Sequence, residues 1–124
     1  MELKRTICII EDDAAVRESL QLVLELQGYC VEEFEDGAQF RVRGDFGDVL
    51  CIILDLNLPG ENGLQILSRL RAEAVTTPAL IVTGRADAGA RKEAQRLDAL
   101  ALFEKPLPAR ELFAAIRSIE EMGG

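Results

Sequence analysis

The sequence predicts an α/β protein in which parallel strands alternate with helices. Five short apolar runs have the length of strands, and a segment with apolar residues at helical spacing follows each run. Most of the runs are continuously apolar, which is typical of a parallel sheet covered on both faces. This pattern predicts a single doubly wound (βα)5 domain with right-handed crossovers.

The predicted strands are apolar runs bounded by turn-forming residues. The third run leads into Asp55 and ends before Pro59 and Gly60, which cannot extend such a strand. The second run carries Glu32 and Glu33, so we expect it at an edge of the sheet, where charges are tolerated. The strands are expected at residues 6–10, 29–34, 49–54, 79–83 and 100–103.

The predicted helices have an apolar face and recognisable end signals. The first begins near Ala14, where Asp12 or Asp13 would cap it, and Gly28 suits its end. The fourth has a thin apolar face, so little burial holds it and we expect it to be mobile. The helices are expected around residues 14–27, 38–43, 64–71, 87–97 and 112–119.

Length and charge limit the classes of function. The 124 residues, 48% of them hydrophobic, suit one domain over residues 1–124. A net charge of −8 without a basic stripe argues against direct binding of nucleic acid or of an anionic membrane surface by this chain. The sequence has no apolar run of membrane-spanning length and no charged-then-apolar leader, so we expect a cytoplasmic protein.

The chain has no histidine, which excludes Ser-His-Asp and Cys-His catalysis and the usual zinc sites. Acid–base or transfer chemistry must therefore use Asp, Glu, Lys, Thr or a metal ion. The cysteines have no CxxC spacing, so we expect three buried, reduced thiols at Cys8, Cys30 and Cys51.

Polar residues follow the ends of four predicted strands. Because the carboxyl ends of parallel strands lie at one edge of a sheet, we expect these side chains to converge there. Crowded carboxylates raise one another's pKa, and a hard divalent cation such as Mg²⁺ relieves their repulsion. The converging residues are Glu11, Asp12 and Asp13 after the first strand, Asp55 after the third, Thr83 after the fourth and Lys105 after the fifth.

These side-chain types suit the transfer of a phosphoryl group to an aspartate. The Asp55 carboxylate would attack, while a metal ion and Lys105 would neutralise charge on the phosphoryl oxygens and Thr83 would donate a hydrogen bond. Each residue alone has an ordinary alternative: a solvated loop acid, a helix cap, a turn residue, a threonine at a strand end or a surface lysine. Their joint occurrence in strand order favours a shared site.

Four segments resemble the receiver domain of two-component response regulators: IIEDD at residues 9–13, ILDLNLPG at 53–60, VTG at 82–84 and EKP at 104–106. The resemblance covers essentially the whole chain and implies the flavodoxin-like strand order 2-1-3-4-5. It implies a sensor histidine kinase as partner and leaves open a homodimer that depends on phosphorylation. It also implies regulation of transcription through a domain outside this sequence.

The resemblance implies a role for each site residue. Asp55 matches the phospho-accepting aspartate, and Thr83 matches the switch hydroxyl that moves to the phosphoryl group. Lys105 matches the lysine that binds this group, before a proline whose preceding bond is typically cis in the family.

The resemblance also implies the ligands of Mg²⁺. When the helix that follows is matched to the family, the acidic pair falls on Glu11 and Asp12 rather than on Asp12 and Asp13. Asp55 and the backbone carbonyl of Asn57 would complete the protein ligands.

One departure from the family lies in the fifth strand. The family usually has an aromatic switch residue three positions before the lysine, where this chain has Leu102. The aromatic Phe103 comes one place later, and strand alternation would point it to the opposite face of the sheet. A leucine at this position can still fill the space that the Thr83 side chain vacates.

Other functions remain as alternatives. A stand-alone receiver or a phosphorelay module would act through protein contacts. A Mg²⁺-dependent phosphohydrolase with an Asp nucleophile typically has a second acid two residues later, where this chain has Asn57, so we expect a phospho-acceptor and not an enzyme. A flavin-binding module is disfavoured because an acidic cluster repels phosphate and the chain has one Tyr and no Trp.

Overall fold

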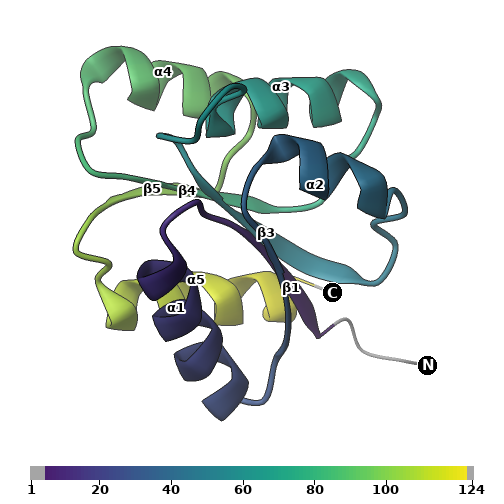
Figure 1. Ribbon diagram of the computed structural model, residues 1–124, viewed down its shortest axis with the longest axis vertical. Helices are drawn as coiled ribbons and strands as arrows, with labels where there is room; N and C mark the ends of the chain where they lie inside the picture. The colour runs from purple at the N-terminus through teal and green to yellow at the C-terminus, as the bar shows by residue number, and fades with distance from the viewer. Residues whose placement is uncertain (1–4, 123–124) are drawn as a thin grey trace.

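The computed structural model describes residues 5–122, so the ends of the expected domain, residues 1–4 and 123–124, lie outside the described residues. Strands and helices alternate along the described chain, as the sequence predicts (Figure 1). Their bounds are β1 Thr6–Ile10, α1 Ala14–Leu26, β2 Cys30–Phe34, α2 Gly37–Arg43, β3 Val49–Asp55, α3 Gly63–Ala72, β4 Ala79–Thr83, α4 Ala88–Arg96, β5 Ala101–Glu104 and α5 Ala109–Glu121.

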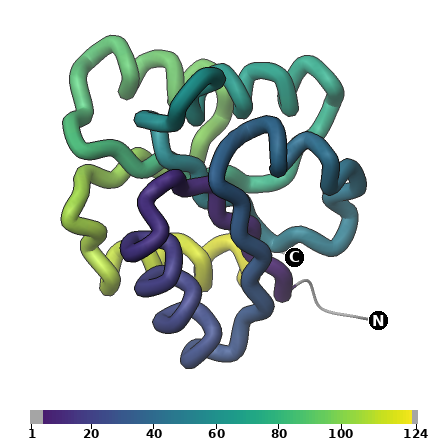
Figure 2. The backbone as a smooth tube through the Cα atoms, in the orientation of Figure 1, coloured from purple at the N-terminus to yellow at the C-terminus, as the bar shows by residue number. Residues whose placement is uncertain are grey.

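The strands form one parallel sheet in the order β2-β1-β3-β4-β5, which confirms the expected fold and the edge position of β2. Helices α1 and α5 cover one face, and α2, α3 and α4 cover the other (Figures 1 and 2). All seven positions of the central β3 are buried, which explains its continuously apolar sequence. Within residues 5–122, none of the helices combines the length and the apolar character that a membrane span requires.

The sheet divides the core into two layers, and strand alternation decides which layer each side chain joins. In β5, Leu102 packs in the layer of α2, α3 and α4, whereas Phe103 packs in the layer of α1 and α5. The prediction that Phe103 faces away from the position of the usual switch aromatic is therefore confirmed. The strand itself lies one residue later than expected, at Ala101–Glu104.

The first helix begins and ends where its sequence signals place it, whereas α5, at Ala109–Glu121, begins three residues before the expected range of 112–119. Asp13, rather than Asp12, caps α1, because its Oδ1 accepts hydrogen bonds from the amides of Ala15 and Val16 at 2.9 and 3.2 Å. Helix α4 contains a single buried residue, Ala94, so its apolar face is thin as expected. Its mobility stays a prediction.

The expectation of three buried thiols is wrong for one cysteine. Cys8 and Cys51 are buried, and burial raises the pKa of each thiol to about 12. Cys30 is exposed because it opens the edge strand β2, whose outer side has no neighbouring strand. An apolar run alone does not tell which residues of an edge strand are covered.

Candidate functional site

Three buried polar side chains lie at the carboxyl edge of the sheet. Glu11 follows β1, Asp55 ends β3 and Thr83 ends β4, and they are 4%, 3% and 0% exposed. The parallel order places these strand ends next to one another, because β3 pairs with both β1 and β4. Such burial is costly for carboxylates unless they meet a cation, so the partners of these residues decide what the site can do.

Lys105 supplies a cation from the segment after β5. Its Nζ donates hydrogen bonds to Glu11 Oε1 and to Asp55 Oδ2, each at 2.9 Å. Its backbone amide donates to the carbonyl of Thr83 at 2.8 Å, which fixes this segment beside β4. The Lys105–Pro106 peptide is cis, as the resemblance implies. The structure thus brings together residues from the ends of four strands, as expected from the sequence.

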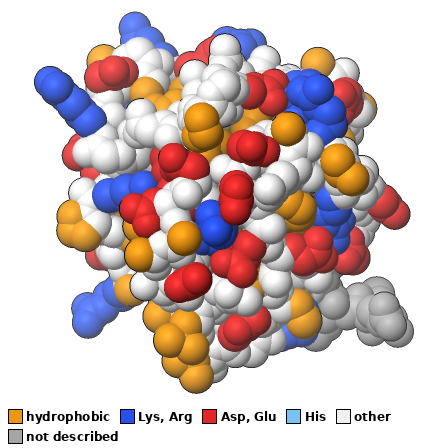
Figure 3. Space-filling model, in the orientation of Figure 1, with side chains coloured by type: hydrophobic (Ala, Val, Ile, Leu, Met, Phe, Trp, Pro, Cys, Tyr) orange, Lys and Arg blue, Asp and Glu red, His pale blue; other side chains and the backbone are white. Residues whose placement is uncertain are grey.

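The acidic residues after β1 have separate roles. Asp12 is exposed, yet one carboxylate oxygen from each of Glu11, Asp12 and Asp55 falls within a group no wider than 4.8 Å. Asp13 lies outside this group because its carboxylate is used as the cap of α1. Figure 3 shows that acidic side chains gather over the middle of the visible face of the molecule. This arrangement supports Glu11 and Asp12, rather than Asp12 and Asp13, as a metal-binding pair.

The electrostatics of the site favour a further cation. Burial and the nearby Asp55 raise the pKa of Glu11 to about 7, although hydrogen bonds from Lys105 and the Asp13 amide lower it. Burial lowers the pKa of Lys105, but its hydrogen bonds to both acids outweigh burial and raise that pKa overall. The Lys105 ammonium thus contacts two of the three grouped carboxylates and is the one cation of the described residues bonded to them. Since Mg²⁺ prefers carboxylate oxygens and solvent, this donor set fits it.

Asn57 connects the acceptor carboxylate to the threonine hydroxyl, through its backbone on one side and its side chain on the other. The backbone N–H of Asn57 donates to Asp55 Oδ1 at 2.9 Å. Its side-chain Oδ1 lies 3.0 Å from the Thr83 hydroxyl and accepts from the Gly84 amide at 3.4 Å. The Thr83 hydroxyl also lies 3.0 Å from the carbonyl of Arg85, so its single proton has two acceptors. This side-chain bond was not predicted, because the sequence pointed only to the backbone carbonyl of Asn57.

Gly63 is a second residue whose role was not predicted. A Cβ at this position would lie 2.4 Å from the carbonyl oxygen of Asp55 and 3.2 Å from the Cα of Leu56. The first residue of α3 therefore packs directly against the backbone that carries Asp55, and only glycine allows this approach. In the sequence, the close approach is indicated by a glycine directly after Asn62, the residue that caps α3.

Comparison with known proteins agrees with this geometry. The family model described as the response regulator receiver domain matches residues 7–117. The transcriptional regulatory protein FixJ of Bradyrhizobium diazoefficiens is 37% identical over 121 residues, which cover 95% of this chain and 58% of FixJ. The cell cycle response regulator CtrA of Brucella ovis is 34% identical over 113 residues, which cover 91% of this chain and 49% of CtrA.

Solved structures of response regulators are also similar to this chain. The response regulator StyR has a TM-score of 0.88 at 27% identity, with 96% of this chain and 60% of that chain covered. The non-phosphorylated receiver domain of HemR from Leptospira biflexa has a TM-score of 0.86 at 26% identity, with 94% of each chain covered.

The chain spans about half the length of the curated relatives it matches, at 58%, 52% and 46% for the first three. The family model, by contrast, covers most of this chain and includes all of the converging residues. The order of the sheet and the acidic pocket beside a lysine agree with that match. The chain belongs to the response regulator receiver domain family and is a receiver domain of a two-component response regulator.

Proposed function

We propose that Asp55 accepts a phosphoryl group from a sensor histidine kinase and that this event switches the surface of the domain. The observation that carries the proposal is the buried Asp55 carboxylate, 2.9 Å from the Lys105 ammonium and grouped with Glu11 and Asp12. No other acid of the described residues belongs to such a group of three. A single domain over residues 1–124 would contain the whole site.

In the proposed reaction an Asp55 carboxylate oxygen attacks the phosphorus of the donor. A new O–P bond forms, and the bond from phosphorus to the donor's leaving atom breaks. Lys105 turns its ammonium from the carboxylate to a phosphoryl oxygen, while the backbone N–H of Asn57 holds the other carboxylate oxygen. The carboxylates of Glu11, Asp12 and Asp55 and the carbonyl of Asn57 would hold Mg²⁺, which supplies positive charge for the phosphoryl oxygens.

The proposed switch is the Thr83 hydroxyl. To donate to a phosphoryl oxygen on Asp55, it must leave its acceptors, Asn57 Oδ1 and the carbonyl of Arg85. Leu102 of the neighbouring β5 lies in the same core layer as α4 and would fill the vacated space. The weakly buried α4 would then move with β5 and α5, which together form the output surface.

We propose that this switch regulates transcription. FixJ, of which this chain covers 58%, is named a transcriptional regulatory protein, so a further domain would act on DNA while this acidic chain does not. A cytoplasmic location and a homodimer that forms on phosphorylation fit that role. A stand-alone receiver that acts through protein contacts is the alternative.

The same geometry argues for a phospho-acceptor rather than an enzyme with turnover. An Asp-nucleophile phosphohydrolase needs a general acid near the leaving group. Asn57 occupies the position two residues after Asp55, and its side chain carries an amide that cannot supply a proton in this way. We therefore propose that one phosphoryl group accumulates on each chain.

The test is incubation with acetyl phosphate and Mg²⁺, followed by intact-mass measurement. The protein should gain the mass of one phosphoryl group, and chelation of Mg²⁺ should prevent the gain. Asp55→Asn should abolish it. Asp98→Asn is the matched control, since Asp98 is an exposed acid in a turn with φ 58°, a conformation that Asn accepts. Equal labelling of Asp55→Asn and the wild type would contradict the proposal.

A further inference from the structure

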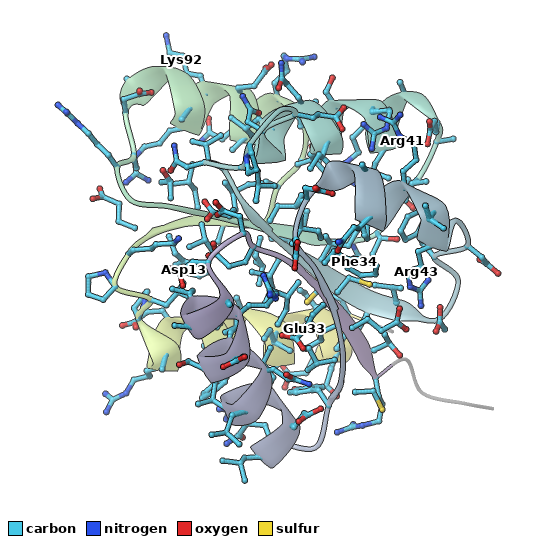
Figure 4. All side chains as sticks on the ribbon, viewed as in Figure 1. Asp13, Glu33, Phe34, Arg41, Arg43 and Lys92 are labelled. Atoms are coloured by element: carbon cyan, nitrogen blue, oxygen red, sulfur yellow. The ribbon has the colours of Figure 1, made fainter. Side chains whose placement is uncertain are left out.

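The edge strand β2 carries two adjacent acids, and each is paired with an arginine on a different face of the sheet. Glu32 accepts from Arg43 of α2, with Nε 2.7 Å from Oε1. Glu33 points to the opposite face, where its Oε1 lies 3.6 Å from Arg17 Nε of α1. Figure 4 shows Glu33 beside α1 and Arg43 at the end of α2. The two acids, expected only as charges that an edge strand tolerates, therefore have specific partners.

Arg17 connects β2 to the acidic pocket. Its Nη1 donates to the backbone carbonyl of Glu11 at 2.7 Å, and its Nη2 lies 3.9 Å from Glu35 Oε1. The Arg17 side chain is 14% exposed, so most of it is removed from solvent. A planar guanidinium can make these contacts together because its donors point in fixed, separate directions.

The main chain of Glu11 is held on both sides. Its amide donates to the carbonyl of Phe34 in β2 at 3.0 Å, and its carbonyl accepts from Arg17. Its side chain accepts from the Asp13 amide at 3.1 Å and from Lys105 at 2.9 Å. The carbonyl that Arg17 binds belongs to the peptide between Glu11 and Asp12. The orientation of this peptide decides where the exposed Asp12 carboxylate points.

We propose that Arg17 is a positioning residue for the metal pocket, held in turn by Glu33, and that it acts by fixing the peptide between Glu11 and Asp12. This inference rests on the proposed function of Glu11, Asp12 and Asp55 as Mg²⁺ ligands. Arg17 binds the carbonyl of Glu11 and not its carboxylate, so it orders the pocket without competing for the metal-binding oxygens. Lys105, by contrast, bonds directly to two of those carboxylates.

The first arm of the test measures Mg²⁺ affinity by titration calorimetry of the purified chain. Arg17→Met should raise the dissociation constant about tenfold, the lower end of the effect of losing a group that orients a metal ligand. Arg17→Lys keeps the charge, but its single ammonium cannot contact Glu11 and Glu33 from two separate nitrogens. The affinity of Arg17→Lys for Mg²⁺ should therefore lie between those of Arg17→Met and the wild type. Glu33→Gln should weaken binding to a smaller extent.

Arg43→Met is the matched control, because it removes the other arginine that pairs with β2. Arg43 lies on the opposite face, bonded to Glu32 and Asp48, and contacts no residue of the pocket. Its loss should lower stability and leave the affinity for Mg²⁺ unchanged. If Arg43→Met weakens binding as much as Arg17→Met does, Arg17 acts only through general stability and the proposal is overturned.

The second arm needs no metal. In Arg17→Met without Mg²⁺, the amide hydrogens of Glu11 and Asp13 should exchange faster than in the wild type, while Arg43→Met should leave them unchanged. Unchanged exchange in Arg17→Met would overturn the inference. If the wild type binds no Mg²⁺ but the exchange differs as expected, the ligand assignment fails and the positioning of the loop by Arg17 stands. If Arg17→Met does not fold, Arg17→Lys and Glu33→Gln decide both arms.

Discussion

Replacing Asp55 with asparagine should stabilise the metal-free protein while removing its function. Without metal, two buried carboxylates, Glu11 and Asp55, share the single ammonium of Lys105. The asparagine side chain has the shape of the aspartate it replaces and keeps an oxygen that can accept from the backbone N–H of Asn57. The substitution removes one negative charge and leaves a balanced pair of Glu11 with Lys105.

The size of the effect is a difference between two opposing contributions. Replacing buried charged groups by uncharged groups of similar volume stabilises by up to about 1–4 kcal/mol. Losing the charged hydrogen bond between Lys105 and Asp55 Oδ2 costs about 1.5–3 kcal/mol. The remaining bond from Lys105 to Glu11 reduces this loss. We expect a net gain of about 1 kcal/mol, which corresponds to a melting temperature about 4 °C higher for a domain of this size.

The assay is urea unfolding at pH 7, with and without Mg²⁺. Metal-free Asp55→Asn should have the higher free energy of unfolding, and Mg²⁺ should stabilise the wild type far more than the variant, because the variant has lost a ligand. Asp98→Asn should behave as the wild type in both conditions. If metal-free Asp55→Asn is less stable than the wild type, two buried carboxylates sharing one ammonium do not destabilise the pocket. An equal gain in the free energy of unfolding from Mg²⁺ in both proteins would likewise refute the reasoning.

The structure also predicts the effects of a larger side chain at Gly63, of thiol reagents and of pH. Gly63→Ala should lower the free energy of unfolding by about 1–3 kcal/mol, because its Cβ would lie 2.4 Å from the backbone oxygen of Asp55. Thermal or urea unfolding measures this, and a Gly63→Ala protein as stable as the wild type would contradict the packing. In a maleimide reaction at pH 7.5, Cys30 should react quickly, whereas Cys8 and Cys51 should react only when the protein unfolds. Mass measurement counts the modified thiols, and a second fast-reacting thiol would contradict the burial of Cys8 and Cys51. The free energy of unfolding of the metal-free protein should fall as pH rises from about 4.5 to 7, because the folded pKa of Glu11, about 7, lies above its ordinary value of 4.5 and the folded state holds the extra proton. Urea unfolding across this range measures the slope, and Asp55→Asn should reduce it.

The fold was predictable because each strand carries its own evidence. The continuous apolar run before Asp55 indicates burial on both faces, and β3 is buried at every position. The charges of β2 indicate an edge, where β2 lies. Strand ends were less predictable, since pairing with neighbours decides them: β5 runs to Glu104, whose partner is Thr83 in β4.

The site was predictable where its residues follow strand ends. Glu11, Asp55, Thr83 and Lys105 converge for that reason, and the parallel sheet provides the geometry. The bond between Asn57 and Thr83 was not predictable, because it depends on the rotamer of an amide in a loop.

The role of Arg17 was hidden in a similar way, since its partners are a backbone carbonyl and an acid of the edge strand. The exposed Cys30 was missed because a short apolar run does not tell which side of an edge strand is covered.

The central claim is that phosphate is attached to Asp55, and the position of the modification tests it most directly. After phosphorylation with acetyl phosphate and Mg²⁺, borohydride reduces an acyl phosphate to the alcohol, which converts phospho-aspartate to homoserine. Peptide mass spectrometry should then find homoserine at position 55 and unmodified Glu11 and Asp12. Reduction at either of those acids, or no reduced residue at position 55 in a phosphorylated sample, would contradict the assignment of Asp55.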